Sequence, residues 1–379
     1  MRIVYFAPID YNAIKQRPQH FADALSDSYD FFYIQPFGLR TIKAKDFSRL
    51  LSRIAHLYSI FSHKKTATIH VKSLFFVPVV SEMFDRINVH LIKKQIVRLL
   101  DQETIFWITT PSSLFPKLLN CFPQIPIIYE MMDDYGMVQP CNKRKIDKTE
   151  KYIISRSRYT IVTAGALLEK ARNISANAES CRLVGNGVSS QFFDRAEYYT
   201  PPEPCFHNGK KTVGYIGATE WWLDIELIHS LAKKFPQVNF VLVGWPKIAD
   251  IPESANVFFI GKRPFESMPD YLNAFDVCII PFKPGEFADS INPVKLYEYF
   301  ALGKPVVSYQ MKELEPYQNI LYLALNSREF AAHLETALNE HDLEKIARRK
   351  KIASENTWDS KIQTVKTILG GLKHDRDGK

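Results

Sequence analysis

Short apolar runs alternate along the chain with longer segments in which apolar residues recur every three to four positions. A short apolar run bounded by polar residues is typical of a buried strand, and the longer period is typical of an amphipathic helix. The first half of the chain has five such runs, at Ile3–Ala7, Phe31–Ile34, Thr104–Ile108, Ile125–Tyr129 and Tyr159–Thr163. The second half has five more, at Thr212–Ile216, Asn239–Val243, Val257–Ile260, Val277–Ile280 and Pro305–Ser308. Predicted helices include Gln19–Leu25, Leu223–Lys234 and Pro293–Leu302.

The alternation of strands and helices predicts an α/β protein with parallel sheets covered by helices on both faces. Two series of strands predict two Rossmann-like, doubly wound domains, and 379 residues fit two domains of ordinary size. Residues 198–211 are rich in proline and polar side chains, which is typical of a linker. We therefore expect a first domain at 1–195, a linker at 196–211, a second domain at 212–355 and a last segment at 356–379.

The composition narrows the environment and the partners of the protein. Five cysteines without a CxxC pair argue against a disulfide framework or a zinc ribbon and favour a reducing cytoplasm. No apolar run has the length of a membrane-spanning helix. The 49 Lys and Arg residues against 41 Asp and Glu residues give a net charge of +8, which predicts a polyanion, an anionic membrane or a phosphorylated substrate as partner.

Part of this positive charge gathers in one segment. Between Arg40 and Lys72 eight basic side chains face a single acidic one, Asp46. Apolar residues recur every three to four positions from Phe47 to Phe61, so the segment predicts a basic amphipathic helix of the kind that lies on membranes. The alternative is an ordinary domain helix with a solvated basic face.

The densest chemical signal lies in residues 290–308. They predict a loop, a helix that starts at Pro293 and stops at Gly303, and a buried strand. The free N–H groups at a helix N-terminus suit a phosphate, and Lys295 in the first turn adds a cation. Glu298 lies on the same face of the helix, where its carboxylate can accept hydrogen bonds from ribose hydroxyls.

This segment resembles the nucleotide-sugar signature of GT-B glycosyltransferases, especially the family 4-like group (glycosyl transferases group 1) of bacterial surface polysaccharide pathways, and within it the teichuronic-acid type. Further matches to the family lie at residues 16–25, 129–135, 184–188, 213–224 and 356–359. The resemblance implies two Rossmann-like domains facing a cleft, the first for the acceptor and the second for the nucleotide sugar. It also implies that the last helix returns to the first domain.

The resemblance further implies a nucleotide-diphosphate sugar as donor, with UDP as the expected nucleotide, and no metal or other cofactor. Gly217 would let the backbone approach the diphosphate, Lys295 would neutralise the leaving group and Glu298 would hold the ribose. The other donor contacts would come from the loop at Lys262 and Arg263 and from the backbone of Asn292, Pro293 and Val294.

One position departs from the family pattern. Many members carry a second glutamate eight positions before the one that corresponds to Glu298, and this chain has Ser290 there. The donor-sugar contact of that glutamate therefore falls to Glu286, Asp289 or Ser290.

The acceptor side has fewer signals. Asp133 and Asp134 follow a buried strand, at the edge where sites of α/β proteins form, and either can act as a base for an acceptor hydroxyl or cap a helix or turn. Arg17 and His20 can bind an acceptor phosphate, although a lone His is more often an ordinary helix residue. For Trp221 and Trp222, stacking on a sugar or base and simple packing are equally open.

The sequence therefore predicts a glycosyltransferase that moves a sugar to a glycan or lipid-linked glycan, as a peripheral protein on the inner face of the bacterial cytoplasmic membrane. One alternative is a sugar-nucleotide epimerase of the same architecture, and another is a non-catalytic protein that binds an anionic surface. Nucleic acid is not expected as a partner, because the chain lacks a zinc finger or an RNA-binding aromatic signature. A dinucleotide oxidoreductase is disfavoured, because no GxGxxG follows the first strand.

Overall fold

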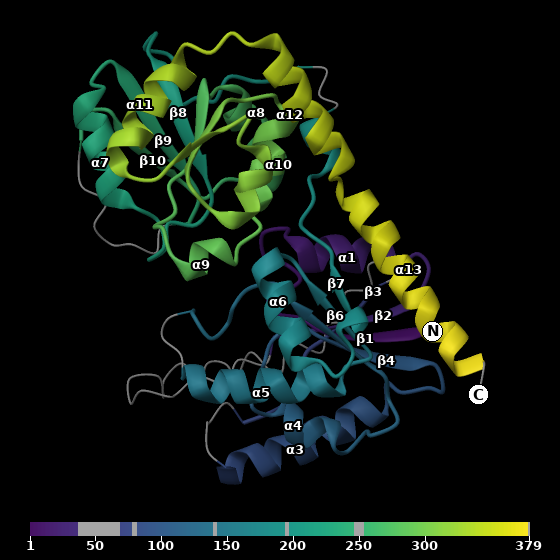
Figure 1. Ribbon diagram of the computed structural model, residues 1–379. Coiled ribbons are helices and arrows are strands. Elements are labelled where there is room, and N and C mark those ends of the chain that lie inside the picture. The colour runs from purple at the N-terminus through teal and green to yellow at the C-terminus, as the bar shows by residue number, and fades with distance from the viewer. Residues whose placement is uncertain (37–68, 78–81, 139–141, 194–196, 246–253, 378–379) are drawn as a thin grey trace. The chain divides into compact units, whose positions relative to one another are not determined.

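The computed structural model describes residues 1–36, 69–77, 82–138, 142–193, 197–245 and 254–377, which form two compact units (Figure 1). The first unit contains Met1–Thr163, Leu167–Val184 and Thr364–Lys379, and the second contains Ala164–Ala166 and Gly185–Gln363. The expected linker at 196–211 falls within the second unit. The last helix, α13 (Trp358–Asp377), begins in the second unit and ends in the first.

The first unit is built on a sheet of seven parallel strands in the order β3-β2-β1-β4-β5-β6-β7. Their bounds are β1 (Arg2–Phe6), β2 (Asp30–Ile34), β3 (Ile69–Lys72), β4 (Thr104–Ile108), β5 (Ile127–Met131), β6 (Tyr159–Val162) and β7 (Cys181–Leu183). The strand order reverses between β1 and β4, so the carboxyl ends of these two strands flank the usual ligand position of a doubly wound fold.

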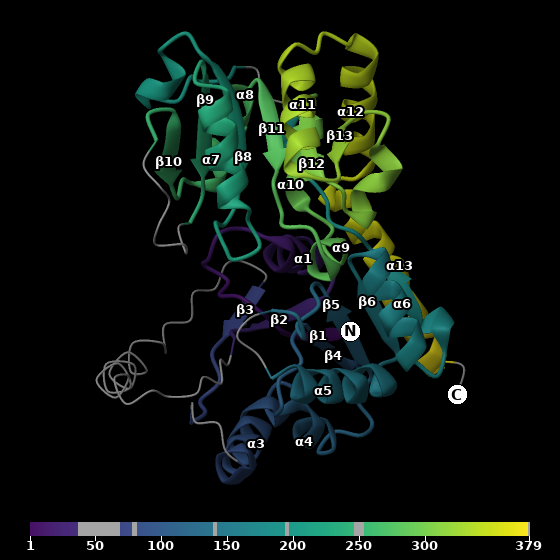
Figure 2. The same cartoon turned by 60° about the vertical axis from the view of Figure 1, so that its left-hand side comes forward.

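Helices cover both faces of this first sheet. They are α1 (Arg17–Leu25), α3 (Glu82–Val97), α4 (Phe115–Leu119), α5 (Lys143–Arg156) and α6 (Gly165–Ile174), together with the end of α13. Helices α3, α4 and α5 lie together on one side of the sheet, and α4 contacts both of the others (Figures 1 and 2).

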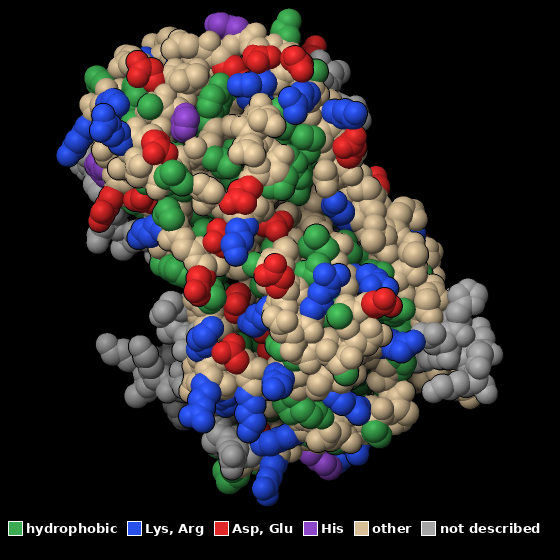
Figure 3. All heavy atoms as spheres, viewed as in Figure 1, with side chains coloured by type: hydrophobic (Ala, Val, Ile, Leu, Met, Phe, Trp, Pro, Cys, Tyr) green, Lys and Arg blue, Asp and Glu red, His purple; other side chains and the backbone are tan. Residues whose placement is uncertain are grey.

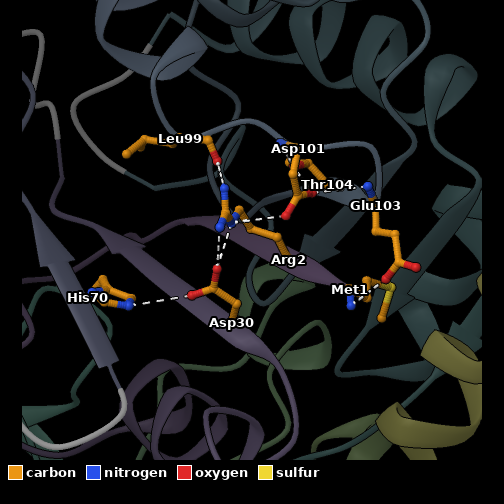
Figure 4. A network of polar contacts seen from close by, with 8 residues as sticks. All are labelled: Met1, Arg2, Asp30, His70, Leu99, Asp101, Glu103 and Thr104. Atoms are coloured by element: carbon orange, nitrogen blue, oxygen red, sulfur yellow. Dashed lines mark hydrogen bonds and ion pairs between the residues drawn. The ribbon is translucent and has the colours of Figure 1, made fainter.

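Arg2 links the amino-terminal ends of neighbouring strands in the first sheet through hydrogen bonds and ion pairs (Figure 4). Its guanidinium donates to Asp30 at 2.7 Å and to the carbonyl of Leu99 at 2.9 Å, and its Nε lies 3.3 Å from Asp101. The terminal ammonium of Met1 pairs with Glu103 at 2.6 Å. Because this network joins β1, β2 and the start of β4 at the edge opposite to the carboxyl ends, it stabilises the sheet and leaves the ligand edge to other residues.

The second unit has a sheet of six parallel strands in the order β10-β9-β8-β11-β12-β13. Their bounds are β8 (Lys211–Ile216), β9 (Val238–Val243), β10 (Val257–Gly261), β11 (Val277–Ile280), β12 (Val306–Tyr309) and β13 (Tyr322–Ala324). The helices are α7 (Ile225–Lys234), α8 (Met268–Asn273), α9 (Glu286–Asp289), α10 (Val294–Ala301), α11 (Ser327–Leu338) and α12 (Leu343–Glu355). The strand order again reverses beside the first strand, between β8 and β11.

The α/β class and the two doubly wound parallel sheets are confirmed, and all ten predicted strands occur with ends within two residues of those expected. The predicted helix at Pro293 starts at Val294 with Pro293 as its N-cap, and Gly303 follows its end with φ +70°. Sequence analysis missed β3, β7 and β13. Each has only three or four residues and is partly buried; β3 and β7 also contain charged or polar side chains, whereas β13 lies within the apolar run 320–325 that the sequence analysis passed over.

The predicted basic helix from Phe47 to Phe61 lies outside the described residues. Within the described parts of the chain, none of the helices combines the length and the apolar character needed to cross a bilayer.

Candidate functional site

Glycines follow or end three neighbouring strands of the second sheet at its carboxyl edge. They are Gly217 after β8, Gly244 after β9 and Gly261 at the end of β10. A Cβ on Gly244 would lie 1.9 Å from the carbonyl oxygen of Gly217, and Gly217 itself has φ +145°. Because only glycine permits this conformation and this approach, the backbone at the edge stays free of side chains, as contact with a ligand requires.

Lys295, in the first turn of α10, reaches the same edge. Its Nζ lies 5.0 Å from the ring centroid of Tyr215 on β8 and 4.5 Å from that of Phe282. A Cβ on Gly217 would lie only 3.1 Å from Lys295 Cε. The structure therefore brings together the glycine and the lysine that the sequence assigned to one diphosphate. The rings hold the ammonium next to the N-terminus of α10.

Burial shapes the electrostatics of α10. It lowers the pKa of Lys295 to about 8, although nearby Glu298 opposes the shift. Burial likewise raises the pKa of Glu298 to about 7, against the effect of Lys295. Both side chains keep part of their surface accessible, so a ligand can reach them. A lysine with a lowered pKa next to free helix N–H groups favours an anionic ligand, because the anion restores the charged form of the lysine.

Asn292 fixes the loop that leads into α10. Its Oδ1 accepts a hydrogen bond from the backbone N–H of Asn186 at 2.9 Å, and its carbonyl accepts from Asn186 Nδ2 at 2.7 Å. Its Nδ2 donates to Glu313 at 2.8 Å. The side chain of Asn292 is thus engaged within the protein. The backbone of Asn292, Pro293 and Val294 stays the predicted contact to phosphate.

The three residues that could replace the first glutamate lie on or next to α9. Glu286 is exposed at the first position of this short helix. Asp289 accepts a hydrogen bond from the backbone of Lys312 at 3.2 Å and lines an open cavity of about 340 Å³. The hydroxyl of Ser290 is buried and donates to the carbonyl of Phe287 at 2.7 Å. Glu286 is therefore the most accessible of the three.

The loop after β10 carries the residues expected to meet a nucleobase. Lys262 Nζ lies 5.7 Å from the ring centroid of Trp245, which is 51% exposed. Arg263 donates to Glu203 and to Tyr271, each at 2.9 Å, and these bonds, above all the one to Glu203, raise its pKa. Arg263 is thus held by the protein itself, while Lys262 and Trp245 present an accessible pair.

Trp221 and Trp222 pack together with Phe287. The centroid distances are 5.6 Å between the two tryptophans and 4.8 Å from Trp221 to Phe287. The two tryptophans therefore connect the loop after β8 to α9, and Trp221 keeps 39% of its surface exposed.

In the first unit, Asp133 and Asp134 follow the carboxyl end of β5, and their surroundings differ. Asp134 is buried; its Oδ1 accepts from the backbone of Gly136 at 3.1 Å and from Lys170 Nζ at 2.9 Å. Among the residues that the structure describes, none donates a hydrogen bond to the Asp133 carboxylate. Burial, followed by the charge of Asp134, raises the pKa of Asp133 to about 6. A carboxylate with a pKa near 6 suits a general base, and this role of Asp133 stays a prediction.

Asp134 also belongs to a group of three carboxylates, with Asp147 and Glu150, whose spacing could hold a metal ion. The ammonium of Lys170 lies among them, 2.8 Å from Glu150 and 3.9 Å from Asp147. Burial lowers the pKa of Lys170, but the carboxylates, Glu150 first, outweigh this and raise it overall. Lys170 thus supplies the positive charge that this group requires.

Arg17 and His20 lie on α1. Arg17 is buried, and its Nε donates to Glu130 at 2.6 Å. Glu130 also accepts from Trp107 at 2.9 Å. Burial, followed by the charge of Lys15, lowers the pKa of His20 to about 3, so this imidazole is neutral at physiological pH. The acceptor-binding role of Arg17 and His20 stays a prediction.

Sequence reasoning did not single out Lys170, Glu130 or Asn186. Glu130 carries a signal, because a glutamate inside a buried strand needs a partner for its charge. Asn186 lies in residues 184–188, which resemble the family, but the resemblance implies no role for its side chain. A single lysine on α6 carries no such signal, because only the fold brings Lys170 to Asp134 and Glu150.

Residues 210–340 match the family described as glycosyl transferases group 1. The chain is also similar to a putative teichuronic acid biosynthesis glycosyltransferase, TuaH, of Bacillus subtilis (strain 168). The two are 24% identical over 293 residues, which cover 71% of this chain and 72% of the relative.

Two solved structures share the fold over nearly the whole chain. Sucrose-phosphate synthase from Thermosynechococcus elongatus matches with a TM-score of 0.70 and 13% identity, covering 99% of this chain and 100% of the other. HepE from Anabaena, in complex with UDP and glucose, matches with a TM-score of 0.69 and 16% identity, covering 98% and 99%. At these identities the likeness shows the fold.

Proposed function

Since this chain is a glycosyltransferase with the GT-B fold, we propose that it transfers a sugar from a UDP-linked donor to a glycan or lipid-linked glycan acceptor in bacterial surface polysaccharide biosynthesis. The main support for this proposal is the close approach of Gly217 to Lys295 in the first turn of α10. Both residues lie inside the segment that matches the family. The similarity to TuaH supports the polysaccharide role, and HepE with its bound UDP supports the nucleotide.

The second unit binds the donor in this proposal. The diphosphate lies on the backbone at Gly217 and at the N-terminus of α10, where Lys295 contributes its charge. Glu298 accepts hydrogen bonds from the ribose, and Lys262 with Trp245 holds the base. As the bond from the sugar C1 to the diphosphate oxygen breaks, negative charge grows on the leaving UDP. The helix N-terminus and Lys295 stabilise that charge without a metal ion.

The first unit supplies the base. The acceptor hydroxyl forms the new bond to C1, and its proton passes to the carboxylate of Asp133. Lys170 holds Asp134 through a charged hydrogen bond, and burial, followed by the negative charge of Asp134, keeps the pKa of Asp133 raised. The products are the glycosylated acceptor, UDP and a protonated Asp133.

A screen of UDP-sugars with acceptors prepared from bacterial cell envelopes tests this function. We expect one UDP-sugar to stabilise the protein against heat and to give sugar transfer, and Lys295→Ala and Glu298→Ala to abolish transfer while the protein stays folded. Lys351→Ala and Glu355→Ala, which change exposed residues of α12, are the matched controls and should retain activity.

The outcomes separate the alternatives. Conversion of a UDP-sugar in the absence of any acceptor would replace transfer by epimerisation. Full transfer in both α10 variants would refute the assignment of this helix to the donor.

A further inference from the structure

Helix α5 presents an exposed surface that is almost entirely basic. Figure 3 shows Lys and Arg side chains gathered over this helix. Its two acidic residues, Asp147 and Glu150, are directed toward Lys170. The exposed cations of the helix are Lys143, Arg144, Lys145, Lys148, Lys151 and Arg156. Lys143 Nζ lies 3.9 Å from Asp147, whose side chain is 40% exposed, and among the described residues no ion pair joins the other five cations to an acid of this helix.

Helix α3 adds exposed apolar side chains on the same side of the sheet. Met83, Ile87 and Val97 are 62%, 42% and 51% exposed. Together with His90 and Lys94 they follow a spacing of three to four residues, so they share one face of the helix. Phe75, 51% exposed, lies beside this helix, because its backbone N–H and carbonyl bond to the side chain of Gln95.

Cations flank this apolar face of α3. Arg86, Lys93 and Arg98 are exposed at its sides and Lys94 is exposed on it, whereas Asp85 is buried and lies 3.7 Å from Lys117. We call the exposed sides of α3 and α5, with Phe75, the basic–apolar face. By contrast, basic helix α12 of the second unit also exposes Glu344 and Glu355.

We propose that the basic–apolar face docks on a bilayer that contains anionic lipids. Lipid phosphates complement the cations of α5, and the apolar side chains of α3 and Phe75 enter the boundary between headgroups and acyl chains. The sequence predicted a membrane contact for the basic segment at Arg40–Lys72. The present proposal assigns a membrane contact to α3 and α5 of the first unit instead. The expected purpose of this docking rests on the proposed function. A Cβ on Gly136 would lie 3.2 Å from Asp134 Oδ1 and 3.5 Å from Lys143 Cγ, so α5 begins beside Asp134. Docking through α5 would therefore bring a lipid-linked acceptor close to Asp133.

The test is sedimentation of the full chain with vesicles of equal parts phosphatidylglycerol and phosphatidylcholine, and with phosphatidylcholine vesicles. The charge variant changes four exposed cations of α5 to Gln: Arg144, Lys145, Lys148 and Lys151. Its control changes four exposed cations of the second unit to Gln: Lys233, Arg348, Lys350 and Lys351. We expect binding only to the anionic vesicles. The α5 variant should bind about a hundredfold more weakly and the control less than about fivefold.

A second pair of variants tests the apolar contribution. Met83→Gln with Ile87→Gln removes two exposed apolar side chains from α3, and Leu325→Gln with Leu343→Gln is the control in the second unit. At high salt the charge attraction is screened, so the α3 variant should lose most of the remaining binding and the control should keep it.

Several outcomes would overturn the proposal. The first is that the native chain does not bind anionic vesicles. The second is that the α5 variant and its control lose vesicle binding equally. The third is that vesicle binding is lost only when Arg49, Arg53, Lys64 and Lys65 are neutralised. A self-association or a nucleic-acid complex that the α5 variant abolishes, with vesicle binding unchanged, would also reject it. UDP-sugar binding, measured on every variant without vesicles, should stay unchanged. A native chain that binds vesicles and no UDP-sugar would reject the proposed function and leave the docking surface standing.

Discussion

At the scale of single residues, Asp133 and Asp134 are adjacent in the chain but differ in their contacts. Asp134 accepts charged and backbone hydrogen bonds, from Lys170 at 2.9 Å and from Gly136 at 3.1 Å. Asp133 has its pKa raised to about 6 by burial and by the charge of Asp134. The sequence left both residues open as base or cap. The hydrogen bonds of Asp134 are those of a cap, so we expect Asp133 to be the base of the two.

Substitution of the two aspartates should have opposite effects on stability. A raised pKa in the folded protein means that ionising Asp133 costs stability, so Asp133→Asn should stabilise the fold by about 1–2 kcal/mol at pH 7. This gain should vanish as the pH falls from about 6 to 4, where the native carboxyl is also protonated. Asp134→Asn should destabilise by about 1.5–3 kcal/mol, because Lys170 loses a charged hydrogen bond. Urea unfolding across this pH range measures both.

Activity completes the comparison of the two aspartates. Native transfer should rise with pH through about 6, as Asp133 ionises, and Asp133→Asn should lose nearly all of it. A destabilised and fully active Asp133→Asn variant would show that Asp133 is a cap.

The pair on α10 predicts a bell-shaped dependence of UDP-sugar affinity on pH. Glu298 must be ionised to accept from the ribose, so affinity should rise through about pH 7; Lys295 must be protonated, so affinity should fall above about pH 8. Calorimetric titration with a UDP-sugar measures this, since its diphosphate has no terminal group that titrates near pH 6.

The two variants should each remove one limb of that profile. Glu298→Gln should abolish the acidic limb. Lys295→Gln should abolish the alkaline limb, lower the affinity overall and move the acidic limb to higher pH, because Lys295 no longer lowers the pKa of Glu298. Constant affinity of the native protein from pH 6 to pH 9 would contradict the pairing of these residues with the ligand.

At the scale of elements, the proposed donor site consists of the end of β8 placed against the first turn of α10. The Asn292 side chain holds the loop before α10, and the rings of Tyr215 and Phe282 contact the Lys295 ammonium. The contact between β8 and α10 leaves no room for a side chain at Gly217, where a Cβ would lie 2.9 Å from Tyr215 Oη and 3.1 Å from Lys295 Cε.

Gly217→Ala should therefore damage donor binding more than stability. The new methyl group displaces the lysine, so affinity for a UDP-sugar should fall about 10- to 100-fold, as expected for loss of one charged contact. Gly209→Ala is the control: its φ of +72° carries backbone strain, but no atom lies within 4 Å of the new methyl group. Both variants should lose about 1–2 kcal/mol of stability, and only Gly217→Ala should lose affinity. Equal affinities in calorimetry would contradict the role of Gly217.

The elements that the sequence predicted are those whose signal is local. Buried strands such as β4 and β11 are continuous apolar runs, and α10 carries a proline at its start and a glycine after its end. Contacts made across the fold had no such signal. Lys170 among the carboxylates, Asn186 against Asn292 and Arg17 against Glu130 depend on segments that are distant in the sequence. The edge strand β7 was missed for a related reason, since two of its three residues are exposed.

At the scale of the whole molecule, the chain passes from the first unit to the second after Val184 and returns after Gln363. Helix α13 therefore contributes residues to both units. Its part in the first unit contains Val365, Ile368, Leu369 and Leu372, which are all buried. The first unit thus takes part of its hydrophobic core from the far end of the sequence, so residues 1–184 alone do not include its complete core.

Ending the chain at Gln363 should therefore unfold the first unit selectively. Four buried aliphatic side chains contribute at most about 1.5–3 kcal/mol each, and together this is comparable to the whole stability of a domain. Segment-resolved hydrogen exchange should show lost protection in β1, β4 and β5, with protection retained in β8 and β11. A chain that ends at Leu372 keeps all four side chains and should match the full protein. If the chain ending at Gln363 protected its first sheet as well as this control, the buried face of α13 would not be part of the core that stabilises the first unit.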